Sequence, residues 1–410
     1  MKKSFPGNDN GTADTNKNGY YRFVGLTSDI QSGRSKSFMI SDQRGRSIEI
    51  AIFNKDGQYY AISNICIHKG APLSKGILEG DIVTCSWHGW KYSIKNGRSP
   101  HKGGDSVNSY EVKIVNSNKL FVNCIPSNLA KRVFTPHKRY RDLERSVNEY
   151  LTHMSMSKDT RLQIDTKKRN TRILGISTTN ANDKMAPRKS TSEEALRFAL
   201  DYAHKYFETE TVMIKLRELN FKHCEGYYSK NANACIFPCS ISEVDSDDQM
   251  LEIYDRVILW ADIVVIATPI RWGSASSLYY QMIQRMNCVQ NQSVTHGKYL
   301  IRDKVAGFII TGGQDNVQHV AGELMSFWSQ LGFVFGKFPF VGWSRGWYAE
   351  DTENNYPAMV GEDDDDENRR TKPSIMMRED IMRTLRGSIE MSRLISSNRY
   401  DEKVLKIQGQ

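Results

Sequence analysis

Two short segments of this sequence place cysteine and histidine side chains at spacings that suit metal binding. The first reads C-I-H and contains Cys66 and His68, and the second reads C-S-W-H and contains Cys85 and His88. Two thiolates and two imidazoles match a [2Fe–2S] cluster in which the cysteines bind one iron and the histidines the other. The same ligand types also serve structural zinc, although zinc sites more often use cysteine pairs separated by two residues. The segments therefore predict a metal centre, and an iron–sulfur cluster fits their spacing better than zinc.

The residues around both segments predict a small antiparallel β domain. Short runs of alternating or β-branched residues, broken by Gly, Asn and Asp, recur over residues 20–124. Runs such as SIEIAIF at 47–53 and YEVKIV at 110–115 are typical of strands joined by turns. Glycines within and after the two segments allow tight turns, so we expect the cysteines and histidines in two short hairpin-like loops.

This part of the sequence resembles the ferredoxin-type Rieske family, and the resemblance covers roughly residues 20–125. The stretch that carries it is CIHKGAPLSKGILEGDIVTCSWHGWKYSIKNG. It implies that Cys66 and Cys85 bind the buried iron, while His68 and His88 bind the outer iron. The aromatic residues that it implies behind the cluster are Trp87, Trp90 and Tyr92.

Rieske domains also serve ring-hydroxylating oxygenases, whose mononuclear iron needs two histidines and a carboxylate. No histidine outside the two segments forms a close pair with a nearby acid at helical spacing. The oxygenase interpretation is therefore disfavoured.

From residue 171 onward the pattern changes to strands that alternate with helices. RILGIS at 172–177 precedes the helix-spaced EEALRFALDYAHKYF at 193–207, and DIVVIATP at 262–269 and KVAGFIITGG at 304–313 continue the alternation. Such alternation is typical of a parallel sheet covered on both faces. The predicted fold class is therefore multidomain, with a small antiparallel all-β domain followed by a three-layer α/β domain.

The first strand of this second region leads through a long loop into a helix, an arrangement that favours a bound phosphate. Free backbone N–H groups and the helix dipole attract anions at a helix N-terminus. Candidate hydroxyl donors in the loop are Ser177, Ser190, Thr191 and Ser192. The spacing of Thr191 and Glu194 also fits a capping box, which would explain the loop as a helix cap.

The second region resembles the NADPH-dependent FMN reductase and iron–sulfur flavoprotein branch of the flavodoxin-like fold, over about residues 171–345. The segment that carries the resemblance is DDQMLEIYDRVILWADIVVIATPIRWGSASSLYYQMIQRM at 247–286. The resemblance implies bound FMN, with NAD(P)H as the electron donor. Two loops at strand ends would contact the flavin ring, as is usual in open α/β sheets. Their residues are Thr268, Pro269, Ile270, Arg271, Trp272 and Gly273 in the first loop, and Thr311, Gly312 and Gly313 in the second.

Three further cysteines leave a question open. Iron–sulfur flavoproteins hold a cluster on a compact cysteine run, and Cys224, Cys235 and Cys239 lie in the corresponding region. Tyr227 stands where a second early cysteine would be expected, so Cys288 or another group would have to complete the ligand set. The simpler interpretation is that these are buried or surface thiols, and a second cluster is the alternative.

Composition and charge exclude several classes of protein. No apolar run reaches membrane-spanning length, and seven cysteines in 410 residues do not resemble a disulfide framework, so we expect a cytoplasmic protein without a membrane partner. The net charge is +9, but most of the basic surplus falls at residues 131–172, without a nucleic-acid-binding pattern. We interpret that segment as a solvated linker or a docking patch for an acidic partner, and we do not expect nucleic-acid binding.

Together these features predict an oxidoreductase that moves electrons between NAD(P)H, FMN and a Rieske cluster, with a partner protein or a small molecule as acceptor. The resembled flavin family also implies a homo-oligomer. The alternative is a non-catalytic electron-transfer or redox-sensing module in which FMN and the cluster exchange electrons only with protein partners. The predicted parts are a disordered leader at 1–19, a Rieske domain at 20–127, a basic, partly helical linker at 128–170, a flavodoxin-like FMN-binding domain at 171–360, and an acidic run with a C-terminal helix at 361–410.

Overall fold

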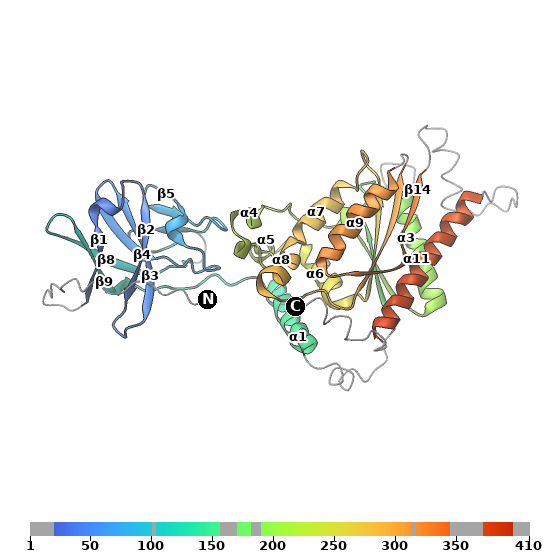
Figure 1. Cartoon of the computed structure of the whole chain (residues 1–410), viewed down its shortest axis with the longest axis horizontal. Helices are drawn as coiled ribbons and strands as arrows, with labels where there is room; N and C mark the ends of the chain where they lie inside the picture. The colour runs from blue at the N-terminus through green and yellow to red at the C-terminus, as the bar shows by residue number, and fades with distance from the viewer. Residues whose placement is uncertain are drawn as a thin grey trace, which may run out of the picture. The chain divides into compact units, whose positions relative to one another are not determined.

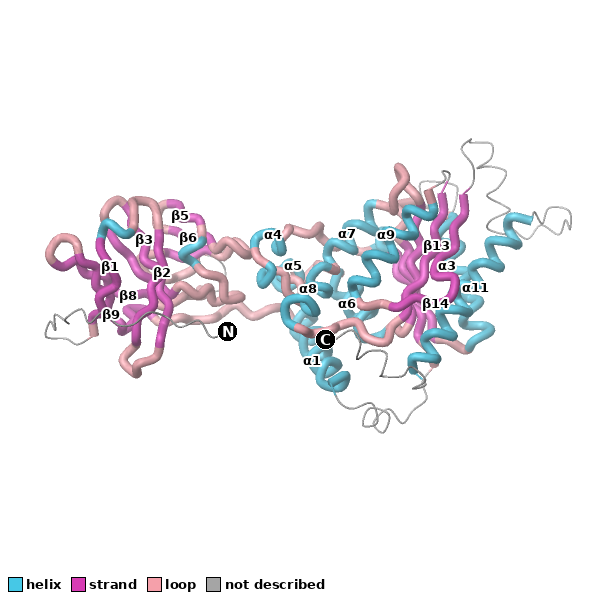
Figure 2. Tube along the Cα trace, in the orientation of Figure 1, coloured by secondary structure: helices cyan, strands magenta, loops and turns pink. Residues whose placement is uncertain are grey.

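The computed structural model describes residues 20–100, 104–155, 170–181, 190–312, 316–344 and 372–396. The chain separates into two compact units, Met1–Thr135 and Pro136–Gln410 (Figure 1). Strands dominate the first unit, whereas helices flank a central sheet in the second (Figure 2). The predicted leader at 1–19, the acidic run at 362–367 and the flavin-loop residue Gly313 lie outside the described residues.

The first unit is an antiparallel β structure built from two sheets. The larger sheet has the order β1-β9-β8-β4-β3-β2, and the smaller sheet has the order β5-β6-β7. Ile50, Ile52, Leu120 and Val122 are fully buried between the elements of the larger sheet, as expected for β-branched and aliphatic residues on a half-covered pleated surface. The strands of this unit are β1 (Tyr21–Leu26), β2 (Ser35–Ser41), β3 (Ser47–Lys55), β4 (Gln58–Ser63), β5 (Ile77–Glu79), β6 (Ile82–Thr84), β7 (Lys91–Ser93), β8 (Ser109–Val115) and β9 (Lys119–Asn128).

The second unit contains a five-stranded parallel sheet in the order β11-β10-β12-β13-β14. This order reverses direction next to the first strand of the unit, as in flavodoxin-like doubly wound folds. Every residue of β12 is buried, because helices cover both faces of the sheet. The predicted fold class is therefore confirmed. The strands are β10 (Arg172–Ser177), β11 (Glu210–Lys215), β12 (Ile263–Pro269), β13 (Val305–Gly312) and β14 (Val334–Ser344).

Helices form the two outer layers of this unit. One face of the sheet carries α3 and α11, and the other carries α1, α6, α7, α8 and α9 (Figure 1). Two short helices, α4 and α5, lie in the connection before α6. Their bounds are α1 (Lys138–Ser155), α3 (Thr191–Phe207), α4 (Tyr227–Lys230), α5 (Ser240–Val244), α6 (Met250–Tyr254), α7 (Ser277–Arg285), α8 (Asn287–His296), α9 (Val317–Leu331) and α11 (Lys372–Ser396).

Helix α11 is an integral layer of the α/β unit. Met377, Ile381 and Leu385 recur at helical spacing and are buried in the core beneath the sheet. The backbone of α11 lies so close to β14 that a Cβ atom on Gly336 would stand 2.6 Å from the carbonyl carbon of Gly387. Glycine at these two positions is what permits the close approach.

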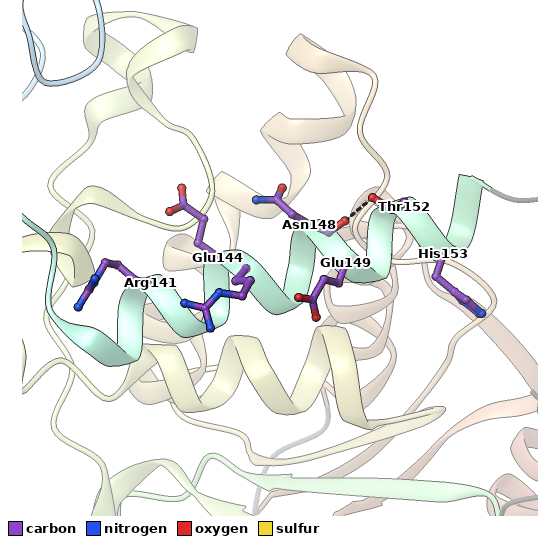
Figure 3. Close-up of a pocket in the computed structure, with 7 residues that line it drawn as sticks. Arg141, Glu144, Asn148, Glu149, Thr152 and His153 are labelled. Atoms are coloured by element: carbon purple, nitrogen blue, oxygen red, sulfur yellow. Dashed lines mark hydrogen bonds between the residues drawn. The ribbon is translucent and has the colours of Figure 1, made fainter. Parts of the chain in front are cut away.

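The expectation of a solvated linker is wrong for residues 138–155, which form helix α1. Tyr140, Leu143 and Val147 are buried in the same core as α6, so this helix belongs to the second unit. Its other face is polar and lines a shallow surface depression, along which the Thr152 hydroxyl donates to the carbonyl of Asn148 at 2.9 Å (Figure 3). Charged residues of both signs, such as Arg141, Glu144 and Arg145, lie on that solvated face because the apolar positions at helical spacing face the core.

Among the described helices, none combines the length and the apolar character that crossing a membrane requires.

Candidate functional site

The two predicted metal-binding loops of the first unit have the same backbone design. The amide of Cys66 donates to the carbonyl of Ala71 at 2.8 Å, and the amide of Cys85 donates to the carbonyl of Trp90 at 2.7 Å. In each loop a glycine amide, from Gly70 or Gly89, donates back to the carbonyl of the cysteine. Both glycines have positive φ, of 82° and 72°, which other residues rarely adopt. The local sequence therefore closes both loops in the same way.

These loops bring all four predicted ligands together. Cys66 and Cys85 are each 2% exposed, and the ring centroids of His68 and His88 lie 4.6 Å apart. The pKa of the Cys66 thiol is raised by two causes, of which the larger is its hydrogen bond with Cys85 and the next is burial. Two buried thiols in contact resist losing both protons unless a cation compensates the charge. This donor set therefore fits a metal centre.

A two-iron cluster suits this geometry better than the zinc alternative. Among the described residues, no group of three or more His, Cys, Asp and Glu side chains surrounds a point where one ion would bind. A structural zinc ion needs four ligands around one centre. A [2Fe–2S] cluster takes only two protein ligands per iron, so a cysteine pair and a separate histidine pair are sufficient.

Aromatic side chains contact the ligands directly. Trp90 stacks on His68, with ring centroids 4.4 Å apart and planes 6° from parallel, and the Tyr92 hydroxyl lies 3.4 Å from Cys66 Sγ. Trp87 makes an edge contact with His88 at 6.4 Å.

Two residues beyond the motif support this arrangement. Phe134 packs edge-on against Trp90 at 5.4 Å. Buried Asp105 accepts hydrogen bonds from the amides of Val133, at 2.5 Å, and Phe134, at 2.8 Å. Asp105 and Phe134 therefore hold the ring that covers His68. Sequence reasoning missed both because neither lies in the motif and no local pattern distinguishes them.

In the second unit, the predicted flavin loops meet at the C-terminal ends of neighbouring strands. Pro269 pairs with Thr311 across β12 and β13, and the amide of Ile270 donates to the carbonyl of Thr311 at 2.7 Å. A Cβ atom on Gly312 would stand 2.8 Å from Cβ of Ile270. Only glycine therefore allows the two loops to approach this closely. Thr268 is buried directly beneath them.

The first of the two predicted flavin loops continues into a tight turn that exposes a tryptophan. Arg271 and Ser274 exchange backbone hydrogen bonds of 2.7 and 3.0 Å around Trp272 and Gly273, which have φ of 50° and 72°. Asn316 donates its side-chain amide to the carbonyl of Gly273 at 2.5 Å. Positive φ is costly for tryptophan, and such strained residues concentrate at ligand sites. The Trp272 side chain is fully exposed at this turn.

The predicted phosphate loop ends at the N-terminus of α3, where the capping-box explanation is wrong. Thr191 is the first helical residue, and the N-cap Ser190 makes no capping bond with its side chain. The Ser190 hydroxyl instead lies 3.2 Å from that of Ser192. The buried Thr191 hydroxyl has no hydrogen-bond partner among the described residues. A buried hydroxyl of this kind at a helix N-terminus fits an anionic ligand.

A buried carboxylate that sequence reasoning missed lies beside this loop. Glu193 is 2% exposed and receives hydrogen bonds from Arg217 and Ser177, the latter at 3.4 Å, and an ion pair from Lys215 at 3.0 Å. The Ser177 hydroxyl is therefore directed to Glu193. Burial raises the pKa of Glu193, but the hydrogen bonds from Arg217 and Lys215 lower it more, so that it lies below its ordinary value.

A second missed contact joins the start of the phosphate loop to α7. The hydroxyl of Ser276, the N-cap of α7, donates to the carbonyl of Thr178 at 2.5 Å. The amide of Asn180 donates to the hydroxyl of Ser277 at 3.1 Å. These bonds hold the β10 and β12 loops on one side of the sheet edge.

The lowered pKa of Glu193 predicts an acid-dependent loss of stability. Its contribution is present above the unfolded pKa of about 4.3 and is lost as the pH falls through the lower folded pKa. We expect Glu193→Gln to lower the unfolding free energy at pH 7 by roughly 1–3 kcal/mol and to flatten its decline below pH 5. Denaturant titrations between pH 3 and 7 measure both effects. Glu218→Gln, at an exposed member of the same cluster, is the control, and an equal loss in that variant would contradict the prediction.

Family comparisons agree with this division of the chain. The model of the Rieske [2Fe-2S] domain matches residues 21–111, and the model of NADPH-dependent FMN reductase matches residues 171–347. The folds and sites thus define a flavin- and iron–sulfur-dependent class of redox protein. The chain contains a Rieske [2Fe–2S] domain followed by an NADPH-dependent FMN reductase domain.

Individual relatives match one domain at a time. The biphenyl dioxygenase ferredoxin subunit of Pseudomonas sp. (strain KKS102) is 41% identical over 51 residues, which are 12% of this chain and 47% of the relative. The 8-demethyl-8-aminoriboflavin-5'-phosphate synthase of Streptomyces davaonensis is 24% identical over 155 residues, which are 38% of this chain and 57% of the relative. Apoptosis-inducing factor 3 of Homo sapiens is 36% identical over 67 residues, which are 16% of this chain and 11% of the relative. The chain thus spans less than two thirds of each of these relatives.

The two domains identify the cofactors as a [2Fe–2S] cluster and FMN. Redox chemistry and electron transfer are the functions that this pair of cofactors supports.

Proposed function

We propose that this protein is an NAD(P)H-dependent oxidoreductase that passes electrons through FMN and the Rieske cluster to an acceptor. The observation that carries the proposal is the presence of a Rieske domain and an FMN reductase domain in one chain. When bound, FMN takes up two electrons as a hydride and the cluster transfers electrons singly. The protein's contribution is to hold, orient and shield the two groups.

In the first unit, we assign the four ligand roles as the sequence predicts them. Cys66 and Cys85 would bind one iron as buried thiolates, and His68 and His88 would bind the other. Burial of His68 to 5% exposure and the stacked Trp90 ring support a fixed imidazole orientation. His68 would then be held in place independently of the redox partner, while the partly exposed His88 would face it.

In the second unit, the proposed FMN site lies at the C-terminal edge of β10, β12 and β13. Thr191 and Ser192 at the start of α3 would bind the phosphate, with Ser190 beside them. Arg217 and Lys215 offset the charge of Glu193 near this position. The loops at residues 268–273 and 311–312 would contact the flavin ring. The exposed Arg271 and Trp272 are our candidates for contacting the nicotinamide.

An anaerobic visible spectrum before and after addition of NADPH, then NADH, tests the proposed function. We expect flavin and iron–sulfur absorption in the purified chain and bleaching of both on addition of at least one nucleotide. Two chromophores that neither nucleotide bleaches would overturn the nicotinamide dependence and favour a module reduced by another protein. The extent of bleaching with each nucleotide also measures the preference between NADH and NADPH.

The unpartnered Thr191 hydroxyl predicts a specific effect on FMN affinity. We expect Thr191→Val to weaken FMN binding roughly 10- to 100-fold, because a hydrogen bond to a charged phosphate contributes about 1.5–3 kcal/mol. Fluorescence titration of the flavin-free chain with FMN measures the change. Thr384→Val is the matched control, since its buried hydroxyl on α11 also lacks a partner among the described residues. Equal weakening in both variants would contradict the phosphate assignment.

The proposed path of electrons through the cluster also requires an electron acceptor. We propose a redox partner protein or a small molecule that takes electrons from the cluster, in a cytoplasmic setting, with the chain acting as a homo-oligomer. Sedimentation analysis of the FMN-loaded chain tests the last point, and a monomer at micromolar concentration would contradict it.

A further inference from the structure

A short segment after β9 reaches the proposed Rieske centre through one aromatic ring. We call this segment, residues 129–134, the strap. The residues at 129–133 are exposed, whereas Phe134 is half-buried and packs edge-on against Trp90, with ring centroids 5.4 Å apart. The Rieske family model matches residues 21–111, so the strap lies beyond the part of the chain that the family accounts for.

Polar contacts hold the strap in place. Ser106 and Lys131 exchange backbone hydrogen bonds of 2.8 and 2.9 Å, and the Ser106 hydroxyl donates to the carbonyl of Leu129 at 3.0 Å. The side-chain oxygen of Asn108 accepts from the amide of Ala130 at 2.6 Å. Because most side chains of the strap are exposed, apolar burial contributes little to its position. The hydrogen bonds therefore determine where the strap lies.

One buried carboxylate fixes the last two residues of the strap. Asp105 is 1% exposed, and one of its oxygens accepts the amides of both Val133 and Phe134. The other oxygen has no hydrogen-bond partner among the described residues. Burying a carboxylate is costly unless hydrogen bonds compensate it, and an apolar side chain would not carry this cost. What the carboxylate adds is a fixed backbone position for Phe134.

The ring that Phe134 contacts belongs to one ligand loop and covers the other. The carbonyl of Trp90 accepts from the amide of Cys85 in the second loop, at 2.7 Å. The Trp90 ring stacks on His68 of the first loop, with centroids 4.4 Å apart and planes 6° from parallel. Stacking of this kind covers one face of the imidazole and keeps water from it. The strap thus contacts the ring that shields a proposed iron ligand.

We propose that Phe134 is a positioning residue for the Rieske centre, which acts through Trp90 on His68 and is itself fixed by Asp105. The proposal rests on the assignment of His68 as an iron ligand. Reduction adds one negative charge to the centre, and water stabilises added charge better than an aromatic surface does. The potential of an iron–sulfur cluster accordingly depends on its exposure to solvent. By keeping Trp90 on His68, Phe134 holds the reduction potential below the value that an uncovered imidazole would give.

An anaerobic redox titration of the full chain, followed by the Rieske electron paramagnetic resonance signal, tests the proposal. We expect Phe134→Ala to retain the signal and to shift the potential upward, because water then reaches the imidazole. Phe134→Leu keeps an apolar side chain without the ring and should shift the potential in the same direction, which decides the question if the alanine variant does not hold the cluster. Phe134→Tyr keeps the ring and should have the wild-type potential. A wild-type potential in every Phe134 variant that retains the signal would overturn the proposal.

Two variants of Asp105 test its role separately from its charge. Asp105→Asn removes the charge but keeps an oxygen that can accept both strap amides, whereas Asp105→Ala removes both. We expect the alanine variant to have the higher potential of the two, because only this variant releases the backbone that carries Phe134. Equal potentials would overturn the role of Asp105 in fixing the strap.

The matched control is a ring pair of the same kind elsewhere in the unit. Phe121 on β9 and Phe23 on β1 pack edge-on at 5.5 Å, and Phe121→Ala should leave the potential unchanged. An equal shift in this variant would overturn the proposal, because any loosening of the unit would then move the potential. Absence of the Rieske signal from the wild-type chain would instead refute the ligand assignment itself. A wild-type signal with unmoved potentials in the variants would refute only the role of Phe134.

Discussion

Replacing Cys66 or Cys85 with alanine is expected to remove the Rieske cluster and two irons per chain. In this assignment each cysteine supplies one of only two thiolates to one iron, and neither the Tyr92 hydroxyl nor the Trp90 ring that contact the ligands supplies a thiolate. The characteristic Rieske electron paramagnetic resonance signal should therefore disappear completely. FMN should remain bound, because the flavin domain has its own core. Iron analysis, resonance spectra and flavin absorbance on the same samples measure the three effects.

The control for this experiment comes from the same unit. Cys124 is as buried as the two ligands, at 2% exposure, but packs in the core of the larger sheet. Cys124→Ala should lose some packing energy and keep the cluster. Retention of the Rieske signal in Cys66→Ala or Cys85→Ala would contradict the ligand assignment. Loss of the signal in Cys124→Ala as well would point instead to a general folding defect.

Asp248→Asn is expected to destabilise the flavin domain by about 3–5 kcal/mol, because it leaves the guanidinium of Arg285 buried without its counter-charge. Both side chains of this pair are fully buried, and Asp248 contacts both terminal nitrogens of Arg285, at 2.6 and 3.2 Å. Asp248 also accepts a hydrogen bond from Ser242 at 2.5 Å. Anaerobic denaturant unfolding, followed by flavin fluorescence and far-ultraviolet circular dichroism, measures the change in this domain.

A neighbouring ion pair provides the matched control. Lys222 pairs with Asp245 at the same distance of 2.6 Å, but the lysine side chain is 60% exposed. Solvent screening makes the contribution of such an exposed pair small. Asp245→Asn should therefore have little effect. Similar losses in both variants would show that burial of the Arg285–Asp248 pair is not what sets its contribution.

Some features of this protein are determined by contiguous sequence. The spacing of Cys66 and His68, and of Cys85 and His88, predicts two ligand loops, and the glycine four residues after each cysteine supplies the positive φ that closes each loop. Alternation of strands with helices predicts the parallel sheet. These features are readable because turn chemistry and side-chain periodicity depend on residues only a few positions apart.

Helix boundaries and caps were less predictable. The residues 191 and 194 match a capping box, yet α3 begins one residue earlier than that pattern requires, with Ser190 at the N-cap. Residues 138–155 belong to the segment that its basic surplus predicted to be a linker, yet Tyr140 and Leu143 bury one face of α1 in the core. In both cases the neighbouring strands and helices decide the outcome, and local composition does not report their positions.

The remaining features depend on contacts between distant segments. Phe134 and Asp105 support Trp90 from outside the ligand motif, and Arg217 neutralises Glu193 from the end of the neighbouring strand. Cys288 lines the same cavity as cysteines that end 49 residues before it in the sequence, a proximity that its local sequence does not predict. The sequence by itself predicted the side chains that we propose as Rieske ligands, and it predicted the parallel sheet that follows. The tertiary structure alone decided which distant side chains share a site, because packing of the helices against the sheet brings them together.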